Sequence, residues 1–335
     1  MKKDFDYLIS VVVPLSNDGD ILSIFCSELF NVLSPRYANF EIVLVDDGST
    51  DTTRSVVSQI LKNLDCIRYL RLSRPTGREI AVTAGFETAI GDFIVVILPE
   101  FDPVSLIPEM IERSRLTGAL VLGRVPEGLY QGTYEKLHAA FIWVCDRLLG
   151  IHLIPNTTYF MVLTRQILNS VNQIRDKFRY VKTLSQQMGV QTEILDYELV
   201  KRRGKSWRRS FYESLNLGID LIVSNSIRPL RYVSLLGLLV SGVYFLYFGY
   251  IAVIALFKDN VAEGWITLSI QNALAFFTLN IILATICEYI GRILLEGKDR
   301  PFYFIVEEKN SSVMIVDQSS RINIVESSEE YARDT

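Results

Sequence analysis

The stretch Glu41–Asp51, EIVLVDDGSTD, decides the fold of the first half of the chain. Ile42–Val45 is a continuous apolar run, which is typical of a strand covered on both faces in a parallel sheet. Two carboxylates, Asp46 and Asp47, end the run and begin a turn. Ligands of open α/β sheets bind beyond the carboxyl ends of strands, so Asp46 and Asp47 are candidate ligands. A capped surface turn is the alternative that this stretch alone leaves open.

Strand-like and helix-like segments alternate on both sides of this stretch. Apolar runs predict strands at residues 8–15, 42–45, 67–72, 93–98, 119–122, 159–163 and 191–199. Helical spacing of apolar residues predicts helices at residues 20–33, 52–64, 79–90, 134–149 and in a segment ending at 115. This order predicts an α/β fold, doubly wound around a mostly parallel sheet.

Composition points to a membrane portion and excludes several classes of protein. The chain has 335 residues, of which 49% are hydrophobic, and its mean hydropathy is +0.25. A net charge of -4 argues against a general nucleic-acid binder. The four cysteines show no CxxC spacing, so neither a zinc site nor a disulfide framework is indicated. Residues 1–10 lack the apolar core of a secretory signal, and we expect the first domain in the cytoplasm.

A basic segment follows the predicted sheet. Residues 201–209, KRRGKSWRR, hold six basic residues in nine. They form either a solvated loop or, because an apolar region follows, a contact with anionic headgroups or phosphates, which we favour. Residues 211–227 have the spacing of an amphipathic helix lying in a membrane interface.

Two long apolar stretches predict a transmembrane hairpin. Residues 233–257 contain 25 residues without a charge, and residues 266–287 form the second stretch. Basic residues lie before the first and after the second, which places both termini in the cytoplasm and a short loop outside. The predicted organisation is a catalytic domain over 1–205, an interfacial helix over 206–230, two spans over 231–292 and a tail over 293–335. Residues after about 307 are polar, and we expect them to be loosely held.

Several motifs together resemble the inverting GT-A glycosyltransferases of family 2, in the polyprenyl-phosphate hexosyltransferase branch related to dolichol-phosphate mannose synthase. They are VVVPLSND (11–18 region), VLVDDGSTD, LSRPTGREIAVTAG, IGDFIVV, LIPEM, RRGKS, IRPLR and CEYIGRILLE. The likeness covers roughly residues 8–305. The QxxRW motif of processive polysaccharide synthases is absent from the sequence, which weakens the hypothesis of polymer synthesis.

The resemblance implies transfer of a hexose from a nucleotide-diphosphate sugar to polyprenyl phosphate, with inversion, at the cytoplasmic face of the inner membrane. It implies that the nucleotide sugar is held by Pro14, Asp46, Asp47, Arg74, Gly77 and Arg78. Arg124, Arg202 and Lys205 are the candidates for the acceptor phosphate, although a surface role is the alternative for Arg124. The implied partners are membrane lipids and a second copy of the chain, but no nucleic acid.

The metal motif departs from the family pattern. The family carries Asp-x-Asp after the fourth strand, whereas this chain reads Leu98-Pro99-Glu100-Phe101-Asp102-Pro103. Glu100 and Asp102 are the candidate ligands for Mg²⁺ or Mn²⁺, which needs only one or two protein carboxylates. A helix cap by Asp102 with a solvated Glu100 is an equally open interpretation.

Other family positions also differ. Asn156 stands where relatives hold an Asp taken as the base, and Met161 where they hold an Arg. Lys201 matches an Arg aimed at the diphosphate, and Ser206 is retained, so the catalytic candidates are Asn156, Lys201 and Ser206. The departures motivate a second hypothesis, in which the protein is a degenerate binding or scaffold subunit, for instance for a lipid-sugar flippase.

Overall fold

The structure is a computed structural model that describes residues 5–126, 133–149, 153–173, 189–203, 264–297, 303–312, 316–317 and 322–323, with eight positions between 232 and 246. The chain separates into two compact units. The first comprises residues 1–139, 152–208 and 301–335, and the second comprises residues 140–151 and 209–300. Lys205, Ser206 and the predicted interfacial helix lie outside the described residues, as does most of the first predicted span.

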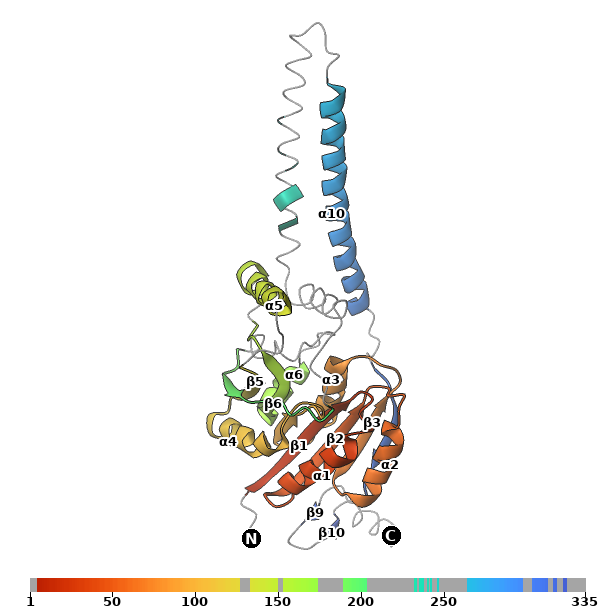
Figure 1. Ribbon diagram of the computed structural model, residues 1–335, viewed down its shortest axis with the longest axis vertical. Helices are drawn as coiled ribbons and strands as arrows, with labels where there is room; N and C mark the ends of the chain where they lie inside the picture. Colours follow the sequence, from red (N-terminus) through yellow and green to blue (C-terminus); the bar gives the residue numbers. More distant parts are fainter. Residues whose placement is uncertain are drawn as a thin grey trace. The chain divides into compact units, whose positions relative to one another are not determined.

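An eight-stranded mixed sheet forms the centre of the first unit, in the order β7-β5-β6-β4-β1-β2-β3-β8 (Figure 1). Its strands are β1 (Phe5–Leu15), β2 (Tyr37–Asp46), β3 (Ile67–Leu72), β4 (Phe93–Val96), β5 (Leu120–Arg124), β6 (Thr157–Thr164), β7 (Thr192–Asp196) and β8 (Ile305–Asn310). β1 to β4 run parallel, as does the pair β5 and β7. β6 is antiparallel to β4 and β5, and β8 to β3. The predicted α/β fold is confirmed.

The described helices follow the predicted alternation. In the first unit they include α1 (Leu22–Leu33), α2 (Thr53–Asn63), α3 (Arg78–Thr88), α4 (Ile107–Thr117) and α6 (Arg165–Gln173); α5 (Thr133–Val144) runs across the boundary of the two units. Short 3₁₀ and π segments occupy Val104–Leu106 and Cys145–Leu149, and a small hairpin joins β9 (Val316–Asp317) to β10 (Ile322–Asn323).

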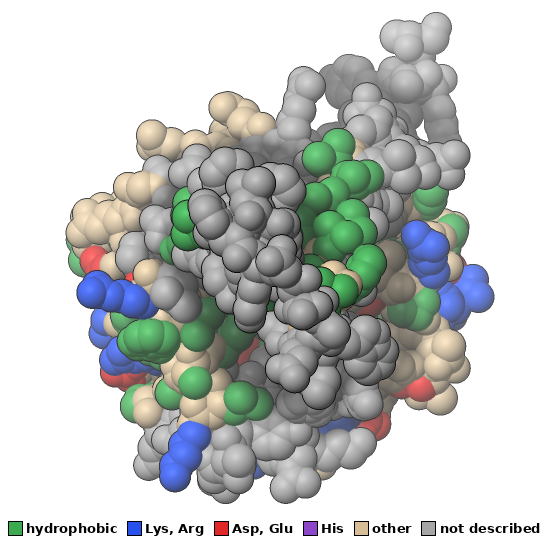
Figure 2. All heavy atoms as spheres, turned by 90° about the horizontal axis from the view of Figure 1, so that it is seen from above, with side chains coloured by type: hydrophobic (Ala, Val, Ile, Leu, Met, Phe, Trp, Pro, Cys, Tyr) green, Lys and Arg blue, Asp and Glu red, His purple; other side chains and the backbone are tan. Residues whose placement is uncertain are grey.

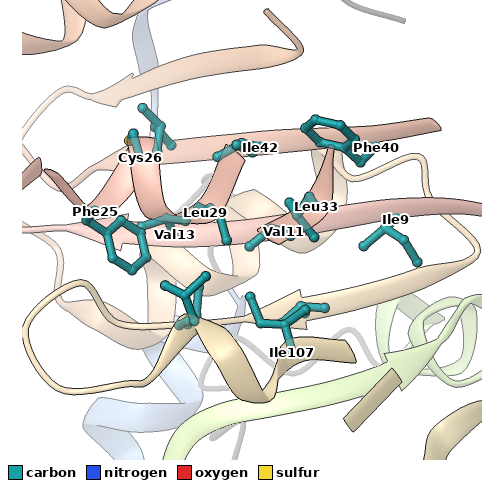
Figure 3. Close-up of a cluster of buried hydrophobic side chains, with 14 of the residues drawn as sticks. Ile9, Val11, Val13, Phe25, Cys26, Leu29, Leu33, Phe40, Ile42 and Ile107 are labelled. Atoms are coloured by element: carbon teal, nitrogen blue, oxygen red, sulfur yellow. The ribbon is translucent and has the colours of Figure 1, made fainter. Parts of the chain in front are cut away.

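Two apolar layers hold the sheet between its helices. On one face, Ile9, Val11 and Val13 alternate along β1 and pack against Phe25 and Leu29 of α1 (Figure 3). This alternation follows from the two-residue period of a strand, and the α1 residues follow the helical period. On the other face, Val12 belongs to a separate cluster with side chains of α3 and α6. Burial of one such aliphatic side chain stabilises the fold by about 1.5–3 kcal/mol.

The edge strand β8 corrects the prediction of a loosely held tail. Residues 305–310 pair antiparallel with β3, and Figure 1 shows the blue strand beside it. Ser311 is buried, its hydroxyl accepts a hydrogen bond from the Ile67 amide at 3.0 Å, and its own amide donates to the Ile67 carbonyl at 2.9 Å. The segment after the second unit is therefore part of the sheet.

The second unit contains one long described helix, α10 (Trp265–Gly297). It exposes large apolar side chains along its length, and Figure 2 shows hydrophobic side chains gathered on this part of the molecule. Gly237 lies against it, since a Cβ added there would meet Ile282 Cδ1 at 3.1 Å. Among the residues that the structure describes, no helix has both the length and the apolar character needed to cross a membrane.

Candidate active site

The carboxyl ends of four parallel strands share one edge of the sheet. β4, β1, β2 and β3 are neighbours in that order, so the turns that follow them lie together. The chain adds β2 and β3 on one side of β1 and then returns to add β4 on the other side. A ligand of an α/β sheet binds in the crevice at such a reversal of strand order. This edge is the candidate active site.

Asp46 ends β2 and is occupied by contacts within the protein. Its carboxylate is fully buried and accepts hydrogen bonds from the Ser49 amide at 2.8 Å and the Tyr69 hydroxyl at 2.6 Å. Burial, followed by the hydrogen bond to Asp46, raises the pKa of Tyr69, which keeps it a donor. Asp46 thus braces the turn from a buried position, which differs from the surface turn of the alternative interpretation. Pro14 is also buried, on β1 opposite Val45.

Asp47 joins the turn after β2 to the loop after β3. Its Oδ1 accepts from the Thr76 amide at 2.6 Å and the Thr76 hydroxyl at 2.8 Å, and its Oδ2 accepts from the Gly77 amide at 2.8 Å. Gly48 makes this approach possible, because its φ is +66° and an added Cβ would lie 2.9 Å from the Arg74 carbonyl carbon. The structure therefore brings Asp47, Gly77 and Arg78, at the start of α3, to one place.

The turn after β1 is tied to the turn after β2. Asn17, with φ at +57°, accepts a hydrogen bond from the Thr50 amide at 2.9 Å through its side-chain oxygen. The Asp18 amide donates to the Thr53 hydroxyl at 3.0 Å, and the Gly19 amide to Asp51 at 3.1 Å. These bonds fix the backbone at the rim of the crevice.

Glu100, after β4, lies between two arginines. Its Oε1 is 2.6 Å from Arg203 Nη1, and its Oε2 is 3.3 Å from Arg78 Nη2. The side chains of Glu100 and Arg203 are 17% and 13% exposed, so solvent screens this ion pair only in part. Glu100 is thus not solvated, as one interpretation held. Each of its carboxylate oxygens already contacts an arginine.

Arg203 also joins the turns at the point where the strand order reverses. Its guanidinium contacts the Asn17 carbonyl, Asp20 at 2.6 Å and Asp18 at 3.1 Å, all in the turn after β1, besides Glu100 after β4. Burial raises the pKa of Asp18 to about 6, although the Ser16 amide and Arg203 act in the opposite direction. The hydrogen bond to Asp20 is the largest of the contributions that raise the pKa of Arg203, so the guanidinium stays charged.

Asp102 is buried and engaged through both oxygens. Its Oδ2 accepts from the Leu98 amide at 2.7 Å, and its Oδ1 accepts from the Tyr197 hydroxyl at 2.6 Å. Burial raises the pKa of Asp102 to about 6, while the bond from Tyr197 and then the bond from Leu98 lower it. Asp102 therefore closes the turn after β4 by binding back to Leu98, and it caps neither of the helical segments that follow, so the helix-cap interpretation was wrong.

The predicted metal ligands do not fit a divalent cation. A metal on Asp102 would break hydrogen bonds whose donors are buried, at a cost of about 1–3 kcal/mol each. A metal on Glu100 would lie beside two guanidinium groups, which repel it. Within the part of the chain that the structure describes, no group of three or more Asp, Glu, His or Cys side chains could hold a metal ion.

Arg202, a candidate for the acceptor phosphate, is engaged in structural contacts. Its Nη1 donates to the Pro99 and Asp102 carbonyls at 2.8 and 2.9 Å, and its Nη2 donates to Glu28 at 2.7 Å. The guanidinium carbon also lies 5.2 Å from the centre of the Phe25 ring. Arg202 therefore fastens the segment after β7 to the turn after β4.

Arg124 and Asn156 lie on the far half of the sheet. Arg124 forms a two-bond pair with Asp196 at 2.6 and 2.9 Å, between the ends of β5 and β7, which agrees with the surface role left open for it. Asn156 precedes β6 with φ at +58°, and its carbonyl accepts from the Val125 amide at 3.1 Å. Met161, expected in the place of a phosphate-binding Arg, is instead buried in the core and pairs with Val96 and Leu122.

Two further candidate residues near the crevice are exposed cations. Arg74 lies in the loop after β3, and Lys201 precedes the Arg202–Arg203 pair; both are exposed. The sequence predictions missed Arg203, Asp18, Asp20 and Tyr197. The basic run and the acidic turn DGD were visible as patterns, but the pairing of residues 183 positions apart was not.

Comparison with known proteins places these observations in a family. Residues 10–98 match the family Glycosyl transferase family 2. An uncharacterized glycosyltransferase of Bacillus subtilis is 29% identical over 298 residues, covering 88% of this chain and 92% of that protein. The bactoprenol glucosyl transferase of Shigella phage SfV is 26% identical over 303 residues, covering 90% of this chain and 99% of that protein.

A solved structure is also similar. Glucosyl-3-phosphoglycerate synthase from Mycobacterium tuberculosis, crystallised with Mn²⁺, uridine diphosphate and phosphoglyceric acid, has a TM-score of 0.44 and 17% identity, covering 65% of this chain and 77% of that one. The match of residues 10–98, together with the near full-length similarity to the phage enzyme, confirms the resemblance stated above. Residues 10–98 thus match glycosyl transferase family 2, and the two relatives above, similar along nearly the whole chain, are glycosyltransferases by name.

Proposed function

We propose that the protein transfers a hexose from a nucleotide-diphosphate sugar to a polyprenyl phosphate such as bactoprenol phosphate, at the cytoplasmic face of a membrane. The observation that carries the proposal is the extent of the similarity to bactoprenol glucosyl transferases. Because 90% of the chain is covered, the similarity must continue beyond the sheet into residues 206–297. A shared catalytic domain alone would stop at about residue 205.

The geometry of the crevice agrees with a donor of this class. Asp47, the loop after β3 and the start of α3 form one linked unit at the carboxyl edge, and Arg78 and Arg203 lie beside it. Guanidinium groups pair well with phosphate oxygens, often through two hydrogen bonds. This edge therefore supports binding of the diphosphate portion of the donor.

The transfer itself requires little proton chemistry. A phosphate monoester has its second pKa near about 6, so at neutral pH much of the acceptor is a dianion. One of its oxygens attacks the anomeric carbon, the bond from that carbon to the diphosphate breaks, and the nucleoside diphosphate leaves with the electron pair. The configuration at the anomeric carbon inverts. An acceptor of this kind needs no strong base, so the reaction tolerates Asn156 in the place of the Asp that relatives hold as the base.

We also propose membrane attachment through the second unit. α10 exposes apolar side chains that include Leu274, Phe276 and Phe277, each more than 60% exposed. Exposure of such a series would be unfavourable in water and is expected for a surface that contacts lipid or another chain. The two-span hairpin with both termini in the cytoplasm stays a prediction, as does assembly into a homo-oligomer.

A transfer assay tests the proposed function. Membranes containing the protein and added undecaprenyl phosphate are incubated with labelled UDP- and GDP-sugars, once with Mn²⁺ or Mg²⁺ and once with excess EDTA. We expect a lipid-soluble labelled product from one donor under at least one of these conditions. The Asp47→Ala variant, which loses the bonds to the loop after β3, should give little product, whereas Glu109→Ala on the exposed face of α4 should match the unaltered protein.

The absence of product from every donor, with the related phage enzyme active in parallel, would overturn this proposal. The binding-subunit hypothesis would then be preferred, and a membrane partner such as a lipid-sugar flippase would be sought by crosslinking.

A further inference from the structure

Two guanidinium groups converge on one carboxylate where the strand order reverses. Arg78 approaches from the start of α3 and Arg203 from the segment after β7, and both contact Glu100 after β4. The three residues come from segments that are far apart in the sequence, so the fold alone brings them together. The side chain of Arg78 is 32% exposed, which leaves it reachable from solvent.

The carboxylates around this cluster already have partners. Asp18 and Asp20 contact Arg203, Glu100 contacts both arginines, and Asp102 is buried under Tyr197. Each oxygen of these four carboxylates thus already accepts from a donor, whereas a divalent cation needs carboxylate oxygens that it can bind itself. This is the reverse of the arrangement expected from the resemblance. Arg203 is used in the same contacts and is 13% exposed, so Arg78 is the arginine of the pair that a ligand can reach.

We propose that Arg78, held in place by Glu100 and backed by Arg203 on the other oxygen of that carboxylate, binds the diphosphate of the donor in place of a divalent cation. The inference rests on the proposed function, since it concerns the donor of that reaction. Glu100 is then a positioning residue that orients two guanidinium groups, and not a metal ligand. The exposed Arg74 and Lys201 add positive charge beside the same two segments.

The proposal accounts for the charge that appears during transfer. When the bond between the anomeric carbon and the diphosphate breaks, the electron pair stays on the departing phosphate oxygen, and the nucleoside diphosphate carries one more negative charge. Fixed hydrogen-bond donors stabilise such a charge strongly in a site that is partly shielded from water. The Arg78 guanidinium supplies such donors without a change of protonation, because arginine remains charged at all relevant pH values.

Binding experiments on the full-length protein in detergent test the metal question directly. UDP and GDP are titrated by calorimetry in excess EDTA and again with Mn²⁺. We expect the dissociation constant of the better nucleotide to differ by less than about threefold between the two conditions, a difference below 1 kcal/mol. In an electron paramagnetic resonance titration, protein plus nucleotide should lower the free Mn²⁺ signal no more than nucleotide alone.

Variants test the role of the arginines. Arg78→Ala should weaken binding of the nucleoside diphosphate by about tenfold to a hundredfold, the usual cost of one charge-assisted hydrogen bond, and binding of the monophosphate much less. Arg78→Lys should recover part of the loss, because the charge returns without the planar fork. Arg113→Ala, which removes an exposed arginine paired with Glu109 on α4, is the matched control and should bind as the unaltered protein does.

Arg203→Ala removes the guanidinium that Asp18, Asp20 and Glu100 share and is expected to disturb the fold, so Arg78 carries the test. Glu100→Gln adds a second measurement: its effect on diphosphate affinity should be the same in EDTA and in Mn²⁺.

A tenfold or larger loss of diphosphate affinity in EDTA, restored by Mn²⁺, would overturn the inference, and so would an Arg78→Ala variant with undiminished affinity. The transfer assay separates this failure from failure of the proposed function. Product formed only with a divalent cation would refute the arginine site and leave the transferase in place. The absence of product under every condition would refute the transferase.

Discussion

The Tyr197 hydroxyl donates a hydrogen bond to Asp102 Oδ1 over 2.6 Å and so joins the residue after β7 to the turn after β4. Both side chains are buried, and the same hydroxyl lies 2.8 Å from Thr158 Oγ1 on β6. This short series of buried hydrogen bonds connects the two halves of the sheet below the crevice. It explains why a carboxylate predicted to bind metal has no oxygen available for one.

Removal of this hydroxyl should destabilise the protein. Tyr197→Phe leaves Asp102 Oδ1 buried without its donor, and a buried acceptor that loses its partner costs about 1–3 kcal/mol. The expected result is a lower midpoint of urea unfolding with an unchanged slope. Tyr232→Phe, in the second unit at a half-exposed position, is the control and should change the midpoint much less. An unchanged midpoint for Tyr197→Phe would show that the hydrogen bond makes no net contribution.

The acidic groups at the crevice predict a decrease in stability as the pH rises. Burial moves the pKa of Asp102 from the usual 3.8 to about 6, and that of Asp18 by a similar amount. Between these values the folded state binds more protons than the unfolded state, so the free energy of unfolding falls as the pH rises from about 4 to about 6 and then levels. Chemical unfolding at a series of pH values measures this slope.

In Asp102→Asn the contribution of one of these groups to the slope should disappear. A variant slope equal to that of the unaltered protein would mean that Asp102 ionises normally in the folded state. The exposed Asp196 serves as the control: the hydrogen bond to Arg124 lowers its pKa below the usual 3.8, so its contribution has the opposite sign and lies below about pH 4, and Asp196→Asn should leave the slope between pH 4 and 6 nearly unchanged.

The central sheet could be predicted from the sequence because its strands are continuous apolar runs. Strand β8 could not, since residues 305–310, IVEEKN, are mostly polar and mostly exposed. Its position depends on pairing with β3, which lies more than 230 positions earlier in the chain. No local pattern carries that information, so the tail was expected to be loose.

The edge at which several candidate residues gather could also be predicted, because the carboxyl ends of parallel strands lie together. The identity of the available groups could not. Asp46 and Asp102 have the residue type of a ligand, but their oxygens are used by Tyr69 and Tyr197, which come from other strands or the segments after them. Sequence patterns show which groups carry charge, whereas only the folded contacts show which of them are already neutralised.

Loss of the Arg124 side chain should have little effect. Its pair with Asp196 is 35% and 46% exposed on the two sides, and exposed ion pairs contribute little to stability. Arg124→Ala should therefore leave the unfolding free energy nearly unchanged, and the apparent KM for polyprenyl phosphate unchanged. A large rise in that KM, with normal donor binding, would return Arg124 to the acceptor site.

Gly48→Ala should impair both folding and donor binding, and Gly118→Ala provides a close control. The two glycines have φ values of +66° and +67°, so a side chain meets the same backbone strain of about 1–2 kcal/mol at either position. They differ in their surroundings, because a Cβ at Gly48 would lie 2.9 Å from backbone atoms of Arg74 and Pro75, whereas a Cβ at Gly118 meets nothing within 4 Å. Backbone atoms cannot rotate away, so the loop that Asp47 holds must shift in Gly48→Ala and carry Arg78 with it.

The variant should therefore lose more unfolding free energy than Gly118→Ala, and it alone should lose affinity for the nucleoside diphosphate. Equal losses in the two variants, with nucleotide affinity intact in both, would show that strain at Gly48 is local and that the loop after β3 does not depend on this contact for its place in the site.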